Sequence, residues 1–532
     1  MPPRGAGRAP PVVSTLLLAS LLGAGPAARA GSPPVERPAD AGWRAALDLV
    51  YDGAFAAAEA RLQDLARENP DDPFGPYLQA LALCWRIEQR PETGALDGDF
   101  ERHLVRAAAL ANAALARDPR DGRARLALGA THAVRSRHQM LRGRRKEAAR
   151  EAVRMREDLL AARALGATVK EVSFGLGLYD YYVDVLPRLV KLLRFLIGMP
   201  GGDRARGLAL IGEAREGCLF HGTEVRVQLY EIDAFYEGRP TRALAQMRAL
   251  RRRYPGWPVW GLKLAEHLRD RLGLYAEGAA AAREVLETAE RGAHPNYQPV
   301  VAAMARLSLG ESLLLDLRLA DARRTLVPAL GGSPQAPALA GRARLLLGRV
   351  LQLEGDREAA LAHLRLAGGS PDPGVRRGAR DAASSPVPPD ELRALRALAL
   401  ARRHREALEE AQALAAGERA FAAWPKSEEA RLLAAEAAFR DGGLERARDL
   451  LDRLPSQEQT DPPFVGPRAR LLLAELEERR GDRGRAVKVY KEVFKEPFAR
   501  DSLRERAAAG LRRAGIDPDR LPAGERALDY SK

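Results

Sequence analysis

The feature that most constrains the fold is a spacing pattern that recurs along most of the chain. In one copy, Gly238 is followed by Ala243, Met247, Leu250 and Pro255, at offsets of 5, 9, 12 and 17 residues. Glycine suits the turn after a helix, apolar residues three or four positions apart share one helical face, and proline ends a helix. A small residue at offset 5 lets two helices approach closely. Each copy therefore predicts one helical hairpin.

Eleven candidate units carry a small residue at this fifth offset. Two intervals between successive units, 36 and 35 residues, are close to a repeat of about 34, and the longer intervals indicate longer helices or insertions. Leu317 replaces the turn glycine in one unit, and the pattern is weak at Ala107, Ala148 and Ala407. A small residue seven positions before the turn, such as Gly348, is expected to pack the first helix. The eleven small residues are Ala58, Ala107, Ala148, Gly207, Ala243, Gly278, Ala322, Ala360, Ala407, Ala447 and Ala486.

This arrangement resembles the tetratricopeptide repeat (TPR) superfamily over roughly residues 41–515. The resemblance implies an all-α fold, a TPR-like α-solenoid of about ten helical hairpins that binds other proteins. The composition agrees with an all-α fold. Hydrophobic residues make up 46% of the chain but aromatic residues only 5%, so most of the hydrophobic residues are alanine and leucine, which are strong helix formers. An unrelated alanine-rich helical bundle is the alternative.

Residues 172–214 carry a more specific resemblance, to the tetratricopeptide-39 group and its fungal mitochondrial outer-membrane relative. In those proteins a glycine-rich helix leads to a Leu-Pro step, an apolar helix, a Gly-Asp turn and a Gly-Leu helix. The matching residues here are Gly175, Gly177, Leu186, Pro187, Gly202, Asp203, Gly207 and Leu208.

The N-terminus has the layout of a secretory signal peptide. Arg4 and Arg8 precede the apolar run 12–25, and small residues at Ala28 and Ala30 suit cleavage before Gly31. The apolar run is too short for a permanent membrane-spanning helix. The abundance of arginine, alanine and glycine is typical of a GC-rich bacterium. We therefore expect export to the periplasm or outer envelope of a Gram-negative bacterium, with an uncleaved N-terminal anchor as the alternative.

The sequence predicts six segments. They are a signal peptide at 1–30, a linker at 31–40, an N-terminal solenoid at 41–366 with an insert near 186–200, a Gly/Pro/Ser-rich loop or linker at 367–391, a C-terminal solenoid at 392–515, and a tail at 516–532.

The insert between Leu186 and Met199 combines apolar residues with a basic residue at every third position. On a helix this spacing gives a wide apolar face and a narrow basic stripe. That face could pack over neighbouring repeats, or the insert could lie at a membrane surface where its basic residues meet anionic headgroups. The residues proposed for this contact are Arg188, Lys191, Arg194 and Phe195.

Motifs of known chemistry are missing from the sequence. There is no HExxH zinc motif, no GxSxG nucleophile elbow and no Walker loop. Cys84 and Cys218 are expected to be buried thiols. The basic run 402–405 is expected at a helix end, where cations are favoured. We predict a non-catalytic scaffold without metal or cofactor, with an α-helical enzyme of unrecognised site as a less favoured alternative.

Protein binding is expected on the concave face, which the first helix of each hairpin lines. The net charge of +14 favours acidic partners, either a protein or peptide or an anionic membrane surface, and export argues against nucleic acid. A peripheral membrane-associated assembly factor is the alternative function. Lys263 fits the carboxylate-clamp TPRs, but His267 and Ser308 replace their asparagines. The predicted binding residues are Gln228, Tyr236, Trp260, Lys263, His267, Arg271, Glu311, Arg342 and Arg349.

Overall fold

The structure is a computed structural model that describes most of the chain. The described residues are 38–89, 93–167, 169–185, 199–292, 294–297, 299–331, 338–454, 460–495 and 501–518. The predicted signal peptide lies outside this range, as do most of the linker and residues 186–198 of the insert, with Arg188, Lys191, Arg194 and Phe195. The described part contains 24 α-helices and no strand, which confirms the all-α solenoid.

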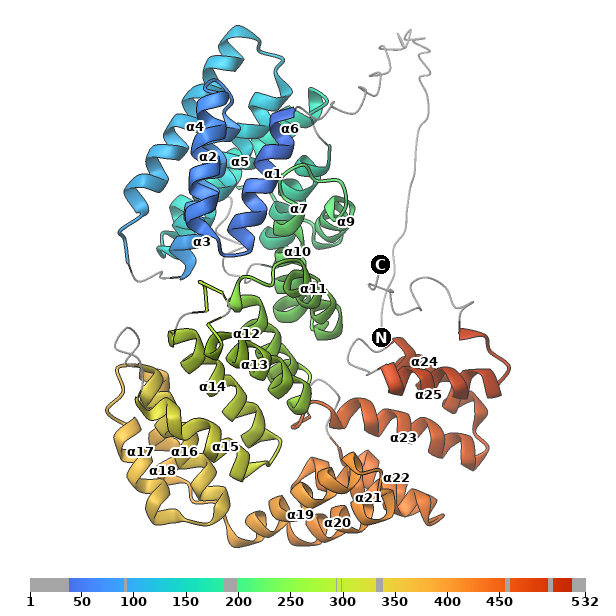
Figure 1. Ribbon diagram of the computed structural model, residues 1–532. Coiled ribbons are helices and arrows are strands. Elements are labelled where there is room, and N and C mark those ends of the chain that lie inside the picture. The colour runs from blue at the N-terminus through green and yellow to red at the C-terminus, as the bar shows by residue number, and fades with distance from the viewer. Residues whose placement is uncertain are drawn as a thin grey trace, which may run out of the picture.

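The N-terminal half is built from antiparallel helix pairs, blue to green in Figure 1. Its elements are α1 (Pro38–Tyr51), α2 (Phe55–Glu68), α3 (Phe74–Gln89), α4 (Asp97–Arg117), α5 (Gly122–Leu141), α6 (Arg145–Ala164), α7 (Val169–Val185), α9 (Arg204–Ala214), α10 (Gly222–Glu231), the π-helical turn η2 (Ile232–Tyr236), α11 (Pro240–Arg253), α12 (Pro258–Glu266) and the π-helical turn η3 (His267–Arg271).

The C-terminal half continues in the same way, from green through yellow and orange to red. Its elements are α13 (Tyr275–Glu290), α14 (Pro299–Leu315), α15 (Leu319–Leu326), the 3₁₀ turn η4 (Val327–Gly331), α16 (Ala338–Glu354), α17 (Arg357–Ala367), α18 (Pro373–Ser384), α19 (Pro389–Glu406), α20 (Glu410–Ala423), α21 (Glu428–Arg440), α22 (Leu444–Asp452), α23 (Val465–Arg480), α24 (Arg483–Lys495) and α25 (Asp501–Arg513).

The turns inside the hairpins follow the predicted spacing. At Gly238 and Gly355, for example, the backbone is left-handed with φ of 61° and 94°, and the small residue five positions later is buried. Leu317 adopts the same conformation with φ of 61°, as expected for a residue in the place of the glycine. The left-handed turn residues that have a buried small residue five positions on are Gly53, Gly143, Gly238, Gly273, Leu317, Gly355, Leu408, Gly442 and Gly481.

Two of the weaker markers are wrong. The turn before α20 lies at Leu408, so the small residue at its fifth offset is Ala413 and not Ala407. Ala107 is buried in the middle of α4, with no turn five residues before it. In both places an alanine-rich helix supplies several small residues, and the spacing alone does not choose among them.

Close packing inside a hairpin explains the small residue seven positions before the turn. A Cβ atom added at Gly348 would lie 2.7 Å from Leu364 Cδ2, and one added at Gly310 would lie 2.4 Å from Leu326 Cδ2. Both leucines stand nine positions after their turn residue, at Gly355 and Leu317. The first helix therefore needs a small residue here to meet the second.

Much of the expected loop at 367–391 is helical, so that prediction is wrong for α18. Asp372 caps this helix by accepting hydrogen bonds from the amides of Gly374 and Val375, and Pro373 takes the first helical position, where proline is tolerated. Val375 and Ala379 are buried against α16 and α17. Proline, glycine and serine thus mark the ends of a helix here.

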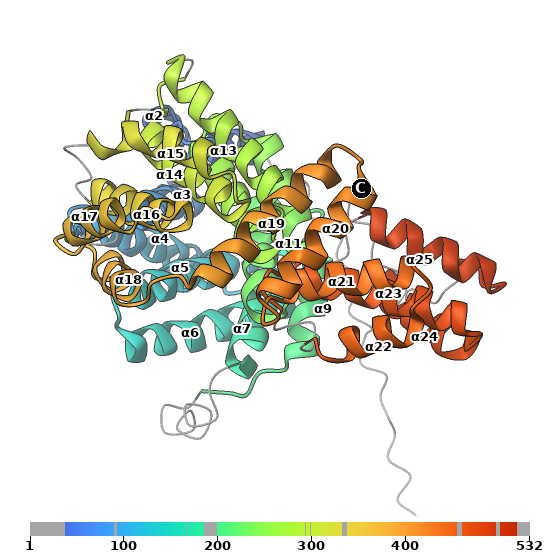
Figure 2. The same cartoon turned by 90° about the horizontal axis from the view of Figure 1, so that it is seen from below.

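The solenoid curves back on itself, so that segments far apart in the sequence meet. In Figure 1 it runs from α1–α4 at the top to α15–α18 at the lower left, and then along the bottom to α23–α25. In Figure 2, seen from below, α19–α21 lie between α16–α18 and α23–α25. The indole of Trp260 donates to the carbonyl of Tyr51 at 2.8 Å, which joins α12 to α1 and closes the first turn of the superhelix.

The interior of this first turn holds a buried charged group. Glu224 accepts hydrogen bonds from Tyr51 (3.2 Å), from the indole of Trp85 (2.6 Å) and from Arg137 (3.1 Å). Arg137 also binds Glu88 at 2.5 Å. Every charge in this group has a partner of opposite sign or a hydrogen-bond donor, which indicates that it holds α1, α3, α5 and α10 together.

Across the described helices, none has the length and apolar character needed to cross a membrane.

Candidate binding pocket

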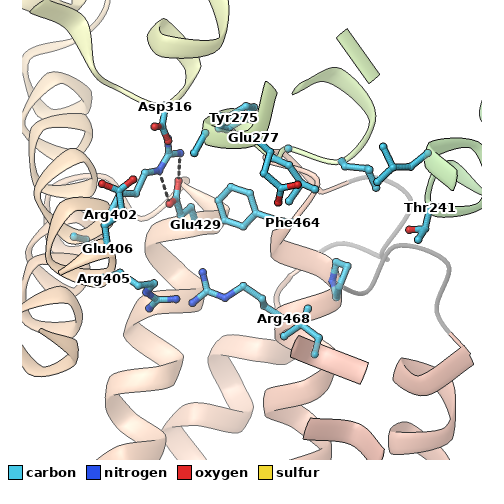
Figure 3. A pocket seen from close by; sticks show the side chains of 18 of the residues that line it. Thr241, Tyr275, Glu277, Asp316, Arg402, Arg405, Glu406, Glu429, Phe464 and Arg468 are labelled. Carbon is cyan, nitrogen blue, oxygen red and sulfur yellow. Dashed lines mark hydrogen bonds and ion pairs between the residues drawn. The ribbon is translucent and has the colours of Figure 1, made fainter. Parts of the chain in front are cut away.

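A pocket of about 700 Å³ lies where α19–α25 face α11 and α13 (Figure 3). Its walls come from segments up to about two hundred and sixty residues apart, so only the curvature of the solenoid brings them together. The lining residues are Thr241, Leu244, Arg248, Leu272, Gly273, Leu274, Tyr275, Ala276, Glu277, Asp316, Ala401, Arg402, Arg405, Glu406, Glu429, Leu433, Phe464, Pro467, Arg468 and Leu503.

Arg402, near the end of α19, connects the walls of the pocket. Its guanidinium donates to Glu429 of α21 at 2.7 Å and 3.0 Å, and to the carbonyl of Leu315 at the end of α14 at 2.7 Å. The guanidinium carbon lies 5.5 Å from the ring centre of Tyr275 and 5.8 Å from that of Phe464. One side chain thus contacts four segments outside its own helix, as the dashed lines in Figure 3 partly show.

The carboxylates around Arg402 outnumber it. Asp316 lies 3.8 Å from its guanidinium, and the Asp316 side chain is only 12% exposed. Burial, together with the nearby Glu406 and Glu429, raises the pKa of Asp316 to about 6 against the opposing effect of Arg402. This end of the pocket therefore holds an excess of acid groups.

One helical turn further along α19, positive charges outnumber negative charges. Arg405 and Arg468 of α23 both bind Glu436 of α21, at 2.7 Å and 2.6 Å. In Figure 3 the two guanidinium groups point toward one another. Burial raises the pKa of Glu436, and the neighbouring Arg405 opposes this shift. Two cations share one carboxylate here.

The turn before α13 closes the pocket on the side of α23. Gly273 has φ of 61°, and a Cβ atom there would lie 3.2 Å from Phe464 and 3.3 Å from Pro463. The rings of Tyr275 and Phe464 meet edge to face at 6.3 Å. Gly273 therefore permits both the turn and the close approach of the distant chain.

Two of the predicted concave residues are not exposed, so that part of the prediction is wrong. Trp260 is 1% exposed and packs beneath α1, as its bond to Tyr51 requires. His267 is also 1% exposed and bonds the carbonyl of Pro240 at 2.7 Å. Burial lowers the pKa of His267 to about 4. Both side chains fill the space between adjacent hairpins.

The other predicted residues lie on the first helices of their hairpins and are at least partly exposed. Tyr236, Lys263, Arg271, Arg342 and Arg349 are exposed, whereas Gln228 and Glu311 are half-buried. None of these residues lines the pocket. Their binding role stays a prediction.

Contacts between neighbouring helices already occupy several of them. The guanidinium of Arg271 lies 4.6 Å from the ring centre of Phe235, and Arg342 binds Glu311 at 2.7 Å. Gln228 accepts from the hydroxyl of Tyr182 at 2.9 Å. The structure thus joins these side chains in pairs and does not gather them into one site.

Sequence reasoning missed the pocket residues of the C-terminal half. The basic run 402–405 does lie at the end of α19, as expected, with Arg403, His404 and Arg405 in the last turn. Two of its arginines, however, face inward to the pocket and do not simply cap the helix. The sequence does contain an indication of this, because arginines three positions apart, such as Arg402 and Arg405, lie on one helical face.

Neither thiol forms a disulfide, and Cys84 is buried as expected whereas Cys218 is only half-buried. Cys84 and Cys218 are both free, and burial raises the pKa of Cys84 to about 12. Within the described residues, no group of three or more His, Cys, Asp or Glu side chains is arranged to hold a metal ion.

Residues 396–465, which span α19 to the start of α23, match the family model of the tetratricopeptide repeat. This segment therefore carries tetratricopeptide repeats, and the repeating helical hairpins of the described chain agree with that family. The match covers much of the pocket wall, including Arg402, Arg405 and Glu429. TPR folds are generally non-catalytic and bind proteins or peptides.

No curated protein matches the chain. Among solved structures it is similar to the TPR domain of P58(IPK), with 15% identity over 78% of this chain and 99% of that chain and a TM-score of 0.21. It is also similar to a chain of the APC/C hetero-tetramer Cut9-Hcn1, with 12% identity over 90% of this chain and 96% of that chain and a TM-score of 0.24. With TM-scores this low, neither likeness supports an argument about this chain. The resemblance of residues 172–214 to the tetratricopeptide-39 group stays a prediction.

Proposed function

We propose that the protein is an exported, non-catalytic scaffold of the bacterial cell envelope that holds a partner protein in the pocket between α11, α13 and the helices α19–α25. The observation that supports this most is the pocket itself. Its volume of about 700 Å³ suits a few side chains of a peptide, and its lining combines leucines and two aromatic rings with charged groups.

The first helices of the C-terminal hairpins supply most of the inner wall. Arg402, Glu429, Phe464 and Leu503 come from α19, α21, α25 or the segment just before α23. A solenoid that curves in this way presents successive helices along one extended ligand. The partner would therefore cross several repeats instead of binding to one.

Site-specific photo-crosslinking tests this role. A photoreactive phenylalanine analogue in place of Thr241, which lines the pocket, should capture a partner in cells that express the protein. The matched control is the same analogue at Leu366, which is 58% exposed on α17 and does not line the pocket. Crosslinks from Leu366 alone, or equal crosslinks from both positions, would contradict the proposed site.

The location in the envelope is a second part of the proposal and rests on the N-terminal sequence. The basic start, short apolar run and small residues before Gly31 support cleavage there. N-terminal sequencing of protein from the native envelope should yield a chain that begins at Gly31. A Met1 start in the cytoplasmic fraction would contradict export while leaving the pocket's role open to its own test.

A further inference from the structure

Arg405 and Arg468 occupy the part of the pocket where positive charge is concentrated. Their side chains are 30% and 21% exposed, and they approach from α19 and α23 on either side of α21. Each donates one hydrogen bond to Glu436, from a terminal guanidinium nitrogen to a different carboxylate oxygen. A guanidinium has five N–H donors. Most donors of both groups therefore have no hydrogen-bond partner within the described chain.

Glu436 is the protein's own carboxylate between these two arginines. Its side chain is 18% exposed, so the carboxylate lies below the two arginines and away from bulk water. Arg506 of α25 adds a third positive charge near Glu436 while it binds Glu475 at 2.8 Å. A carboxylate is thus held between two guanidinium groups by one charge-assisted hydrogen bond from each, a class of bond that is stronger than one between neutral groups.

We propose that Arg405 and Arg468 form a fork that binds an acidic side chain of the partner, and that Glu436 occupies this fork in the free protein as an internal competitor. The inference rests on the proposed role of the pocket in binding a partner. A carboxylate from outside reaches the unused donors directly from the pocket, which both arginines line.

The apolar residues that line the pocket around the fork limit the kind of ligand that can bind there. Leu433 and Leu503 line the pocket together with Pro467, and Leu244 and Leu272 line it as well. The fork thus selects an acidic residue that is flanked by apolar residues in an extended peptide. The excess of acid groups around Arg402 would repel a second acidic side chain, so one carboxylate is expected for each bound segment.

The titration of Glu436 fits this role. Burial raises its pKa, so the competitor takes up a proton more readily than an exposed glutamate when a second carboxylate approaches. The charged groups that face it from the neighbouring helices are Arg405 and Glu410, Arg468, and Arg506 with Glu475.

The test uses the full chain and two fluorescein-labelled, C-terminally amidated decapeptides of leucine and glutamine, which differ only at one central position that is glutamate in the acidic peptide and glutamine in the other. Fluorescence anisotropy at low salt should show the acidic peptide binding at least about tenfold more tightly, because only it offers a side-chain carboxylate to the fork. The double variant Arg405→Gln/Arg468→Gln should abolish this preference. The control Arg403→Gln, exposed on the same helix and outside the pocket lining, should keep it.

The variant Glu436→Gln separates competition from a merely structural role. Removal of the competitor should tighten binding of the acidic peptide several-fold, whereas a structural role for Glu436 would leave affinity unchanged or weaken it. The triple variant Arg405→Gln/Glu436→Gln/Arg468→Gln removes both arginines together with the buried carboxylate that they share, and it leaves only the exposed Glu410 without its cation, so it should fold without the preference.

The inference is overturned if the two peptides bind the unaltered protein equally, or if Glu436→Gln does not tighten binding. Either result together with crosslinking from Thr241 would leave the pocket as the partner site and remove only the fork. Loss of that crosslinking would contradict the proposed function itself.

Discussion

At the scale of single residues, the turns show which positions tolerate a side chain and at what cost. Among the described residues, nine hairpin turns use a left-handed residue, and seven of these residues are glycine. Leu317 and Leu408 are the exceptions, with φ of 61° and 60°. A side chain in this region costs about 1–2 kcal/mol. Leu317 offsets part of this cost by packing against the core around α19–α21, whereas Leu408 is 89% exposed.

Leu408→Gly should therefore stabilise the protein. Relief of backbone strain outweighs the added flexibility of glycine, and we expect the free energy of unfolding to rise by about 1 kcal/mol. Urea denaturation followed by circular dichroism measures this difference. Leu317→Gly is the matched control, and it should stabilise less or destabilise because it also removes buried contacts. Equal gains from both variants would show that packing at Leu317 contributes nothing.

Asp316 predicts a dependence of stability on pH. Its pKa of about 6 in the folded protein is above the ordinary value of 3.8, so the folded state binds this proton more tightly. The contribution of Asp316 is therefore most favourable below about pH 4 and is lost as pH rises to about 6. The difference in pKa corresponds to on the order of 3 kcal/mol. Asp316→Asn should gain stability relative to the unaltered protein over this pH range and then level off. A stability difference that stays constant between pH 4 and pH 7 would contradict this assignment.

At the scale of the element, α7 and α9 show how glycine sets the distance between two helices. A Cβ atom on Gly207 of α9 would lie 2.6 Å from the amide nitrogen of Tyr181 and 2.8 Å from the carbonyl oxygen of Gly177, both on α7. Backbone atoms cannot move aside as a flexible side chain can. The glycines in the segment that resembles the tetratricopeptide-39 group thus have a packing role.

Gly207→Ala should separate α7 from α9 and lower the free energy of unfolding by about 3 kcal/mol, at the upper end of the usual effect of overpacking. Gly212→Ala, five residues later on α9, is the matched control. A Cβ atom there meets nothing within 4 Å, so the variant should stabilise by about 0.5–1 kcal/mol through helix propensity. Thermal denaturation of the two variants should shift in opposite directions, and shifts of the same sign would contradict the close approach.

At the scale of the whole molecule, two contacts close the superhelix in different ways. The first turn closes through buried aromatic packing, in which Trp260 lies 5.2 Å from Trp257 and 6.0 Å from Trp85 between ring centres. The second closes around one charged side chain, Arg402, with Tyr275 and Phe464 beside it. The first closure combines this aromatic packing with the paired charges of Glu224 and Arg137, whereas the second closure centres on a single guanidinium.

Arg402→Met should open the second closure. The variant leaves Glu429, 5% exposed, without its cation, and breaking a buried pair in this way costs about 3–5 kcal/mol. Small-angle scattering should show a larger radius of gyration, and hydrogen exchange should rise in α19–α21 but not in α1–α5. Arg403→Met, next to it and exposed, should change neither measurement. An unchanged radius of gyration for Arg402→Met would show that other contacts close this turn.

The sequence by itself determined the repeating hairpin. The turn at Gly355, the small residue Ala360 and the close contact of Gly348 with Leu364 all fall within seventeen residues, so their spacing alone carries the geometry. Leu317 in place of a glycine was predicted for the same reason. The spacing predicted the wrong residue at Ala407, because several neighbouring alanines fit the pattern equally well.

Only the tertiary structure decided which surfaces meet. The superhelix results from small rotations between successive hairpins, and no single unit encodes their sum. Curvature therefore buries Trp260 beneath α1, brings Arg402 to Leu315 at the end of α14, and places Arg405 opposite Arg468 across α21. Local spacing shows that a residue lies on the first helix of a hairpin, but the distant chain that packs against this helix decides whether the residue is exposed.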